Sequence, residues 1–140
     1  MRRAKILLVD DEVAFANNIS KLISKRGYDI ITVYNGESAV QAVDEQDFDV
    51  IVLDLKMPGM DGMAALKLIK GKKPGVEVII LTGHGSFESG IDGMQLGAFD
   101  FIMKPVRFDD LYEKIRQAYQ RKLIIEESGT GSNADGRGRD

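Results

Sequence analysis

The 140-residue chain contains no cysteine, no tryptophan and a single histidine, His84. Without cysteine it can form no disulfide, and it offers neither a thiolate metal ligand nor a cysteine nucleophile. A metal site built from several imidazoles is excluded as well, so a bound metal would have to take oxygen ligands. Long apolar runs are also missing, and the sequence therefore predicts neither a secretory signal nor a membrane-spanning helix.

The overall composition is that of a globular protein. Apolar residues make up 44% of the chain and charged residues 29%, with a formal net charge of −3. The length suits one domain with a real hydrophobic core. We expect a cytoplasmic protein that touches no membrane, and the surplus of acids from Glu126 onward argues against direct binding of nucleic acid.

Five short apolar runs recur along the chain, and none of them alternates with polar residues. They occupy residues 6–9, 30–33, 50–53, 78–81 and 101–103. Uninterrupted apolar strands are typical of a parallel sheet that is covered on both faces. The segments between the runs have apolar residues at helical spacing. We therefore expect an α/β fold, a doubly wound (βα)5 sandwich.

Glycine marks two features of the second half of the chain. The helix expected near residues 86–96 contains Gly90 and Gly93, each of which costs about 0.5 to 1 kcal/mol relative to alanine, so this helix should be the loosest. The stretch EESGTGSNADGRGRD, residues 126–140, has no large apolar residue. We expect a domain over residues 1–125, followed by a flexible glycine-rich tail or the start of a linker.

Polar residues follow four of the five apolar runs. They are Asp10, Asp11 and Glu12 after the first run, Asp54 after the third, Thr82 and Gly83 after the fourth, and Lys104 and Pro105 after the fifth. Right-handed crossovers bring the carboxyl ends of parallel strands to one edge of the sheet, where ligands bind. These side chains are therefore expected to meet.

Each of these polar residues also has a plainer explanation. The acids after the first run could cap a helix, Asp54 and Thr82 could belong to loops or caps, and Lys104 could be a surface amine. Taken together, however, neighbouring carboxylates repel unless a cation neutralises them, and oxygen ligands suit Mg²⁺, with Mn²⁺ as the alternative. An added amine and hydroxyl complete a phosphoryl-binding pocket in which Asp54 is a candidate nucleophile.

Four motifs make the pattern specific: LLVDDE, VLDLKMPGMDG, LTGHG and GAFDFIMKP. In their order and spacing the chain resembles the receiver domain of two-component response regulators, from residue 4 to about residue 122. The resemblance implies a flavodoxin-like sheet with strand order 2-1-3-4-5.

The resemblance also implies the chemistry of the site. Asp54 would accept a phosphoryl group from the phosphohistidine of a histidine kinase. Mg²⁺ would be held by Asp10, Asp11, Asp54 and the backbone carbonyl of Lys56. Lys104 would contact the phosphoryl group, and the Lys104–Pro105 peptide bond would be cis.

Further residues would report or reverse the modification. Thr82 would move toward the phosphoryl group and Phe101 would turn inward with it, although ordinary core packing also explains Phe101. Lys56 and His84 occupy positions that modulate loss of the phosphoryl group, although His84 is equally explained as a solvated loop residue.

The implied function is a signalling switch rather than a metabolic enzyme. The domain would catalyse its own phosphoryl transfer and autodephosphorylation, and phosphorylation would change partner binding through the face formed by the fourth helix, fifth strand and fifth helix. The expected partners are a sensor histidine kinase or phosphotransfer protein and a downstream effector or missing output domain. A phosphorylation-dependent homodimer is a further alternative.

Three rival functions fit the residues less well. Phosphatases of the haloacid dehalogenase type need a second acid two residues after the nucleophile, where this chain has Lys56. A flavin or nucleotide binder would place phosphate against the acids of residues 10–12, which would repel it. A scaffold that is never phosphorylated would not need Asp11, Asp54, Thr82 and Lys104 together.

Overall fold

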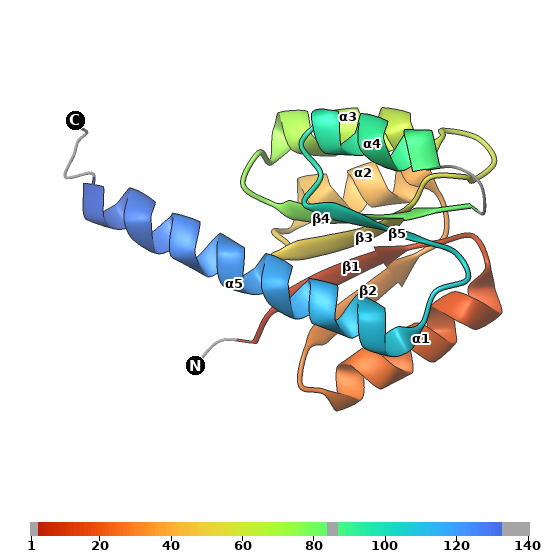
Figure 1. Ribbon diagram of the computed structural model, residues 1–140, viewed down its shortest axis with the longest axis horizontal. Helices are drawn as coiled ribbons and strands as arrows, with labels where there is room; N and C mark the ends of the chain where they lie inside the picture. The colour runs from red at the N-terminus through yellow and green to blue at the C-terminus, as the bar shows by residue number, and fades with distance from the viewer. Residues whose placement is uncertain (1–2, 84–86, 133–140) are drawn as a thin grey trace.

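The computed structural model describes residues 3–83 and 87–132, in which five strands alternate with five helices (Figure 1). In chain order they are β1 Lys5–Val9, α1 Val13–Lys25, β2 Asp29–Val33, α2 Gly36–Glu45, β3 Val50–Asp54, α3 Gly62–Lys72, β4 Glu77–Thr82, α4 Phe87–Gln95, β5 Asp100–Met103 and α5 Phe108–Ser132.

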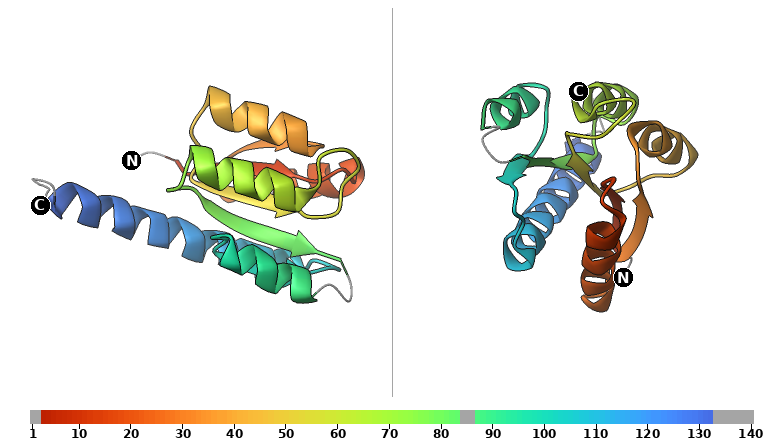
Figure 2. Two further views of the ribbon diagram at one scale, coloured as in Figure 1. Left: turned by 90° about the horizontal axis from the view of Figure 1, so that it is seen from above. Right: turned by 90° about the vertical axis from the view of Figure 1, so that its right-hand side faces the viewer.

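All five strands are parallel and lie in the order β2-β1-β3-β4-β5. Helices cover both faces of this sheet, with α2, α3 and α4 on one side and α1 and α5 on the other (Figures 1 and 2). The predicted doubly wound architecture and its strand order are therefore confirmed.

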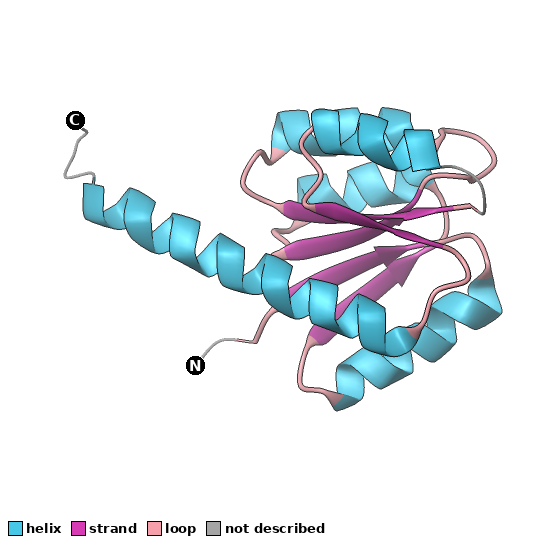
Figure 3. Ribbon diagram, viewed as in Figure 1, coloured by secondary structure: helices cyan, strands magenta, loops and turns pink. Residues whose placement is uncertain are grey.

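The position of the central strands between two helical layers explains why their sequences are apolar throughout. Along β1, Leu7 and Val9 pack toward the cluster that includes α2 and α3, whereas Ile6 and Leu8 pack toward the cluster that includes α1 and α5. Both faces of the pleat are thus buried, as the sheet between two helical layers in Figure 3 illustrates. Burial of each such side chain contributes roughly 1.5–3 kcal/mol, which makes this sheet the rigid support of the domain.

The two glycines of α4 lie where the helix touches the sheet. A Cβ atom on Gly90 would lie 2.4 Å from Cδ2 of Phe101, and one on Gly93 would lie 2.1 Å from Cδ1 of Ile80. Both glycines are buried. They therefore allow α4 to pack closely on β4 and β5, a role that helix propensity alone does not reveal.

Helix α5 continues past Glu126, where the sequence predicted the start of a flexible tail, and ends at Ser132. It extends beyond the amino ends of the strands (Figure 1). Lys122 pairs with Glu126 one turn later and lies 3.6 Å from the buried Asp49, which stabilises the helix at this point. Residues 133–140 lie outside the described residues.

Within residues 3–83 and 87–132, no helix combines the length and the apolar character needed to cross a bilayer.

Candidate functional site

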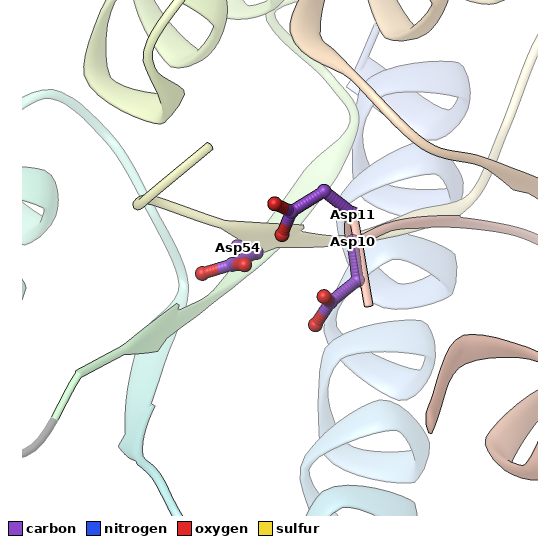
Figure 4. Close-up of side chains that lie close together, drawn as sticks. All are labelled: Asp10, Asp11 and Asp54. Carbon is purple, nitrogen blue, oxygen red and sulfur yellow. The ribbon is translucent and has the colours of Figure 1, made fainter. Parts of the chain in front are cut away.

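Three aspartates meet at the carboxyl ends of β1 and β3 (Figure 4). Asp10 and Asp11 follow β1 directly, and Asp54 is the last residue of β3. The parallel register sets Val9 beside Leu53, which brings the two strand ends level. One carboxylate oxygen from each aspartate lies within 4.8 Å of the others. The predicted convergence of acids at this sheet edge is thus what the fold produces.

Asp10 is fully buried, and its two carboxylate oxygens have different surroundings. Oδ1 accepts a hydrogen bond of 2.9 Å from the backbone N–H of Glu12. Oδ2 lies 3.3 Å from the Lys104 ammonium but accepts no hydrogen bond from the part of the chain that the structure describes. Glu12, the N-cap residue of α1, makes no side-chain cap bond. The side chain of Glu12 therefore does not cap α1.

Asp54 is buried beside Asp10, with only 3% of its side chain exposed. Its Oδ1 accepts a 3.1 Å hydrogen bond from the backbone N–H of Lys56, and its Oδ2 lies 3.3 Å from the Lys104 ammonium. The pKa of Asp54 is raised to about 6, mainly by burial and additionally by the charge of Asp10, against the lowering effects of the Lys56 N–H and the Lys104 ammonium. Burial also raises the pKa of Asp10. The positive charge near the site therefore does not fully offset the cost of burying these two carboxylates.

Lys104 supplies the cation that the structure places among these acids. Its backbone N–H donates to the carbonyl of Thr82 at 2.7 Å, which anchors it at the end of β5. Burial lowers the pKa of Lys104, but its hydrogen bond to Glu12 and the charges of Asp54 and Asp10 outweigh burial, so the pKa lies above its usual value. The Lys104–Pro105 bond is cis. Lys104 is therefore an ion-paired site residue and not a solvated surface amine.

Two contacts of Lys104 were not foreseen from the sequence. Its ammonium bonds Oε1 of Glu12 at 3.0 Å and lies 5.7 Å from the centre of the Phe15 ring. Glu12 was recognised as one of the acids after β1, but 92 positions separate it from Lys104. No spacing rule relates residues so far apart, so only the folded chain reveals the pair.

The remaining predicted site residues surround this cluster. Thr82 ends β4 with a buried hydroxyl that makes no hydrogen bond within residues 3–83 and 87–132. Phe101 of β5 packs over Gly90 and meets the ring of Phe87 edge to face, with ring centres 5.6 Å apart. Lys56 is exposed just beyond Asp54. His84 lies outside the described residues.

The donor set suits a small, hard divalent cation. Asp10, Asp11 and Asp54 offer only oxygen, and Oδ2 of Asp10 is a buried acceptor without a hydrogen bond from the described residues. Mg²⁺ prefers such ligands and retains several waters, for which the exposed Asp11 leaves access. These three residues could hold the ion, and the carbonyl of Lys56 remains a prediction.

The family model and the similar sequences relate the chain to the same protein family. The family model of the response regulator receiver domain matches residues 6–116. The chain is 36% identical over 113 residues to the transcriptional regulatory protein ZraR of Salmonella typhimurium, covering 81% of this chain and 26% of that protein. It is 35% identical over 118 residues to GlrR of Escherichia coli, covering 84% and 27%. The chain thus spans about a quarter of the length of these relatives.

Solved structures resemble this fold over nearly the whole chain. A response regulator receiver domain protein from Clostridium thermocellum is 38% identical, with a TM-score of 0.83 over 87% of this chain and 98% of that one. The receiver domain of a LuxO repressor protein from Vibrio parahaemolyticus is 31% identical, with a TM-score of 0.85 over 91% and 98%.

Proposed function

The chain belongs to the response regulator receiver domain family, and we propose that it acts as a phosphorylation switch in two-component signalling. Asp54 would be the phosphate acceptor, because it ends β3 within the motif VLDLKMPGMDG and its Oδ2 accepts a hydrogen bond from the Lys104 ammonium, whereas Oδ2 of Asp10 accepts none from the described residues. This juxtaposition is the observation that best supports the proposal.

The proposed transfer is a nucleophilic displacement. A carboxylate oxygen of Asp54 attacks the phosphorus of a phosphohistidine, the P–N bond breaks, and the imidazole nitrogen keeps its electron pair. A bound Mg²⁺, held by Asp10, Asp11, Asp54 and the Lys56 carbonyl, would neutralise charge on the phosphoryl oxygens. Lys104 would pair with the same oxygens, and the hydroxyl of Thr82, which makes no hydrogen bond to any described residue, would donate one to them.

We propose that the acyl phosphate is also lost at this site. Water attacks phosphorus, the P–O bond to Asp54 breaks, and the carboxylate and inorganic phosphate are released. Lys56, exposed at the mouth of the site, and His84, outside the described residues, would set the access of that water.

Phosphorylation in vitro tests the proposal directly. Incubated with Mg²⁺ and acetyl phosphate, the protein should gain the mass of one phosphoryl group, because Asp54 can use any sufficiently reactive phosphoryl donor. The Asp54→Asn variant, and wild-type protein in EDTA, should gain none. An unmodified wild-type mass, or an equal gain in the variant, would contradict the proposal.

The proposed output surface consists of α4, β5 and α5. Movement of Thr82 toward the phosphoryl group would draw Phe101 inward, and the ring lies directly against Gly90 of α4. We therefore expect phosphorylation to change amide hydrogen exchange in α4 and β5, measured by mass spectrometry with and without acetyl phosphate. Exchange that changes only around residues 54–62 would rule out this route.

The partners are proposed from the same family membership. A sensor histidine kinase or phosphotransfer protein would supply the phosphoryl group in the cytoplasm, and the receiver itself would bind neither nucleic acid nor membrane. Since the matched segment makes up only 26% and 27% of the transcriptional regulatory proteins ZraR and GlrR, an output domain or separate effector would receive the signal. A phosphorylation-dependent homodimer would use the α4-β5-α5 surface.

A further inference from the structure

The loop between β3 and α3, residues 55–61, is tied to Asp54 at both ends; we call it the phosphoacceptor loop. The N–H of Lys56 donates to Oδ1 of Asp54 at 3.1 Å. The N–H of Gly62 donates to the carbonyl of Leu55 at 3.0 Å, and a Cβ atom on Gly62 would lie 2.6 Å from the carbonyl oxygen of Asp54. A shift of this loop would therefore move the groups around the acceptor.

The middle of the phosphoacceptor loop rests on the first turn of α2. The N–H of Met60 donates to Oε2 of Glu37 at 3.2 Å. Gly59 has φ of +81°, and a Cβ atom there would lie 3.3 Å from the same oxygen. On the other side, a Cβ atom on Gly36 would lie 2.8 Å from the carbonyl oxygen of Met60. The loop backbone at Gly59 and Met60 is therefore in direct contact with the carboxylate of Glu37.

We infer that Glu37 is a positioning residue for the phosphorylation site: its carboxylate holds the backbone at Gly59–Met60 so that the phosphoacceptor loop keeps Lys56 in place beside Asp54. The inference rests on the proposed function and adds to it a residue of α2, a helix that supplies none of Asp10, Asp11, Asp54 or Lys104.

An ordinary explanation of Glu37 is the helix dipole, since acids in the first turn of a helix stabilise it. That effect needs only a negative charge and no particular partner. The observed carboxylate instead accepts a hydrogen bond from a residue 23 positions away in the loop. A glutamine at this position keeps an accepting oxygen but loses the charge, so the two explanations can be separated.

The experiment compares Glu37→Ala and Glu37→Gln with the control Glu45→Ala. Glu45 lies in the same helix, and within the described residues its carboxylate accepts a hydrogen bond from Gln41. Mg²⁺ affinity is measured by calorimetry, and the rate of phosphorylation by acetyl phosphate is measured across Mg²⁺ concentrations. Loss of one loop-positioning hydrogen bond should raise the Mg²⁺ dissociation constant of Glu37→Ala about 3- to 10-fold. The maximal phosphorylation rate should change less than the affinity does.

The controls decide between the explanations. Glu37→Gln should stay close to wild type in Mg²⁺ affinity, because its amide oxygen accepts from Met60, and Glu45→Ala should be unchanged. A Glu37→Ala variant with wild-type Mg²⁺ affinity would overturn the inference, and so would a Glu37→Gln variant as weak as Glu37→Ala. If wild type binds Mg²⁺ but is never phosphorylated, the proposed function fails while the calorimetric comparison still decides the role of Glu37. Wild type that binds no Mg²⁺ would overturn both.

Discussion

Replacing Asp54 with asparagine should make the metal-free protein more stable at pH 8, by about 1 to 3 kcal/mol. The carboxylate is almost completely buried, and burial is the main reason that its pKa rises from 3.8 to about 6. The folded protein therefore disfavours the ionised form relative to the unfolded chain. Asparagine has nearly the same shape without the charge. Urea unfolding of both proteins in EDTA measures the difference.

The pH dependence of this difference follows from the two pKa values. Above pH 6 the free energy of unfolding is lowered by the full cost of burying the ionised Asp54 carboxylate. As the pH falls from about 6 to 3.8, the folded protein binds a proton that the unfolded chain does not yet bind, so wild-type stability rises. Below 3.8 both states are protonated and the cost is gone.

The stability gap between Asp54→Asn and wild type should therefore close as the pH is lowered toward 4. Asp10 is present in both proteins, and the loss of its repulsion with the ionised Asp54 adds to the gap at pH 8. Saturating Mg²⁺ at pH 8 should also narrow the gap, because the ion binds the folded wild type. A gap that does not vary with pH, or an asparagine variant that is less stable at pH 8, would contradict the electrostatic argument.

Replacing Lys104 with methionine should affect phosphorylation and Mg²⁺ binding in opposite directions. The ammonium lies 3.3 Å from both Asp10 and Asp54, where it would stabilise charge on a transferred phosphoryl group, so its loss should slow phosphorylation by acetyl phosphate about 100-fold. The same ammonium repels a second cation among these acids. Its removal should therefore tighten Mg²⁺ binding, by about 3- to 10-fold.

Two further variants make the Lys104 experiment decisive. Lys104→Arg retains the positive charge, so its Mg²⁺ affinity should stay close to that of wild type. Lys72→Met removes an exposed amine that pairs with Asp44 far from the site, and should leave both measurements unchanged. Mg²⁺ affinity from calorimetry and phosphorylation rates from intact mass would be recorded on the same preparations. A Lys104→Met variant with a near-wild-type rate, or with weaker Mg²⁺ binding, would refute the assigned role.

The architecture was predictable because its signals are local. Runs such as residues 50–53 are apolar at every position, which indicates a strand covered on both faces, and the right-handed crossover then places Asp10 and Asp54 at the same edge. Over residues 3–83 and 87–132 the structure confirms that arrangement, with the five predicted strands. The end of α5 was less predictable, because contacts from Lys122 to Asp49 and Glu126 stabilise a helix that composition disfavours.

The precise contacts within the site could not be predicted in the same way. Glu12 meets Lys104, Glu37 meets Met60, and Gly90 lies against Phe101, yet the members of each pair belong to different elements. Periodicity and spacing describe how one segment presents its own side chains, whereas such pairs depend on the distance and rotation between packed segments. The sequence alone therefore established which residues reach this edge of the sheet, and packing in three dimensions determined which atoms hold them there.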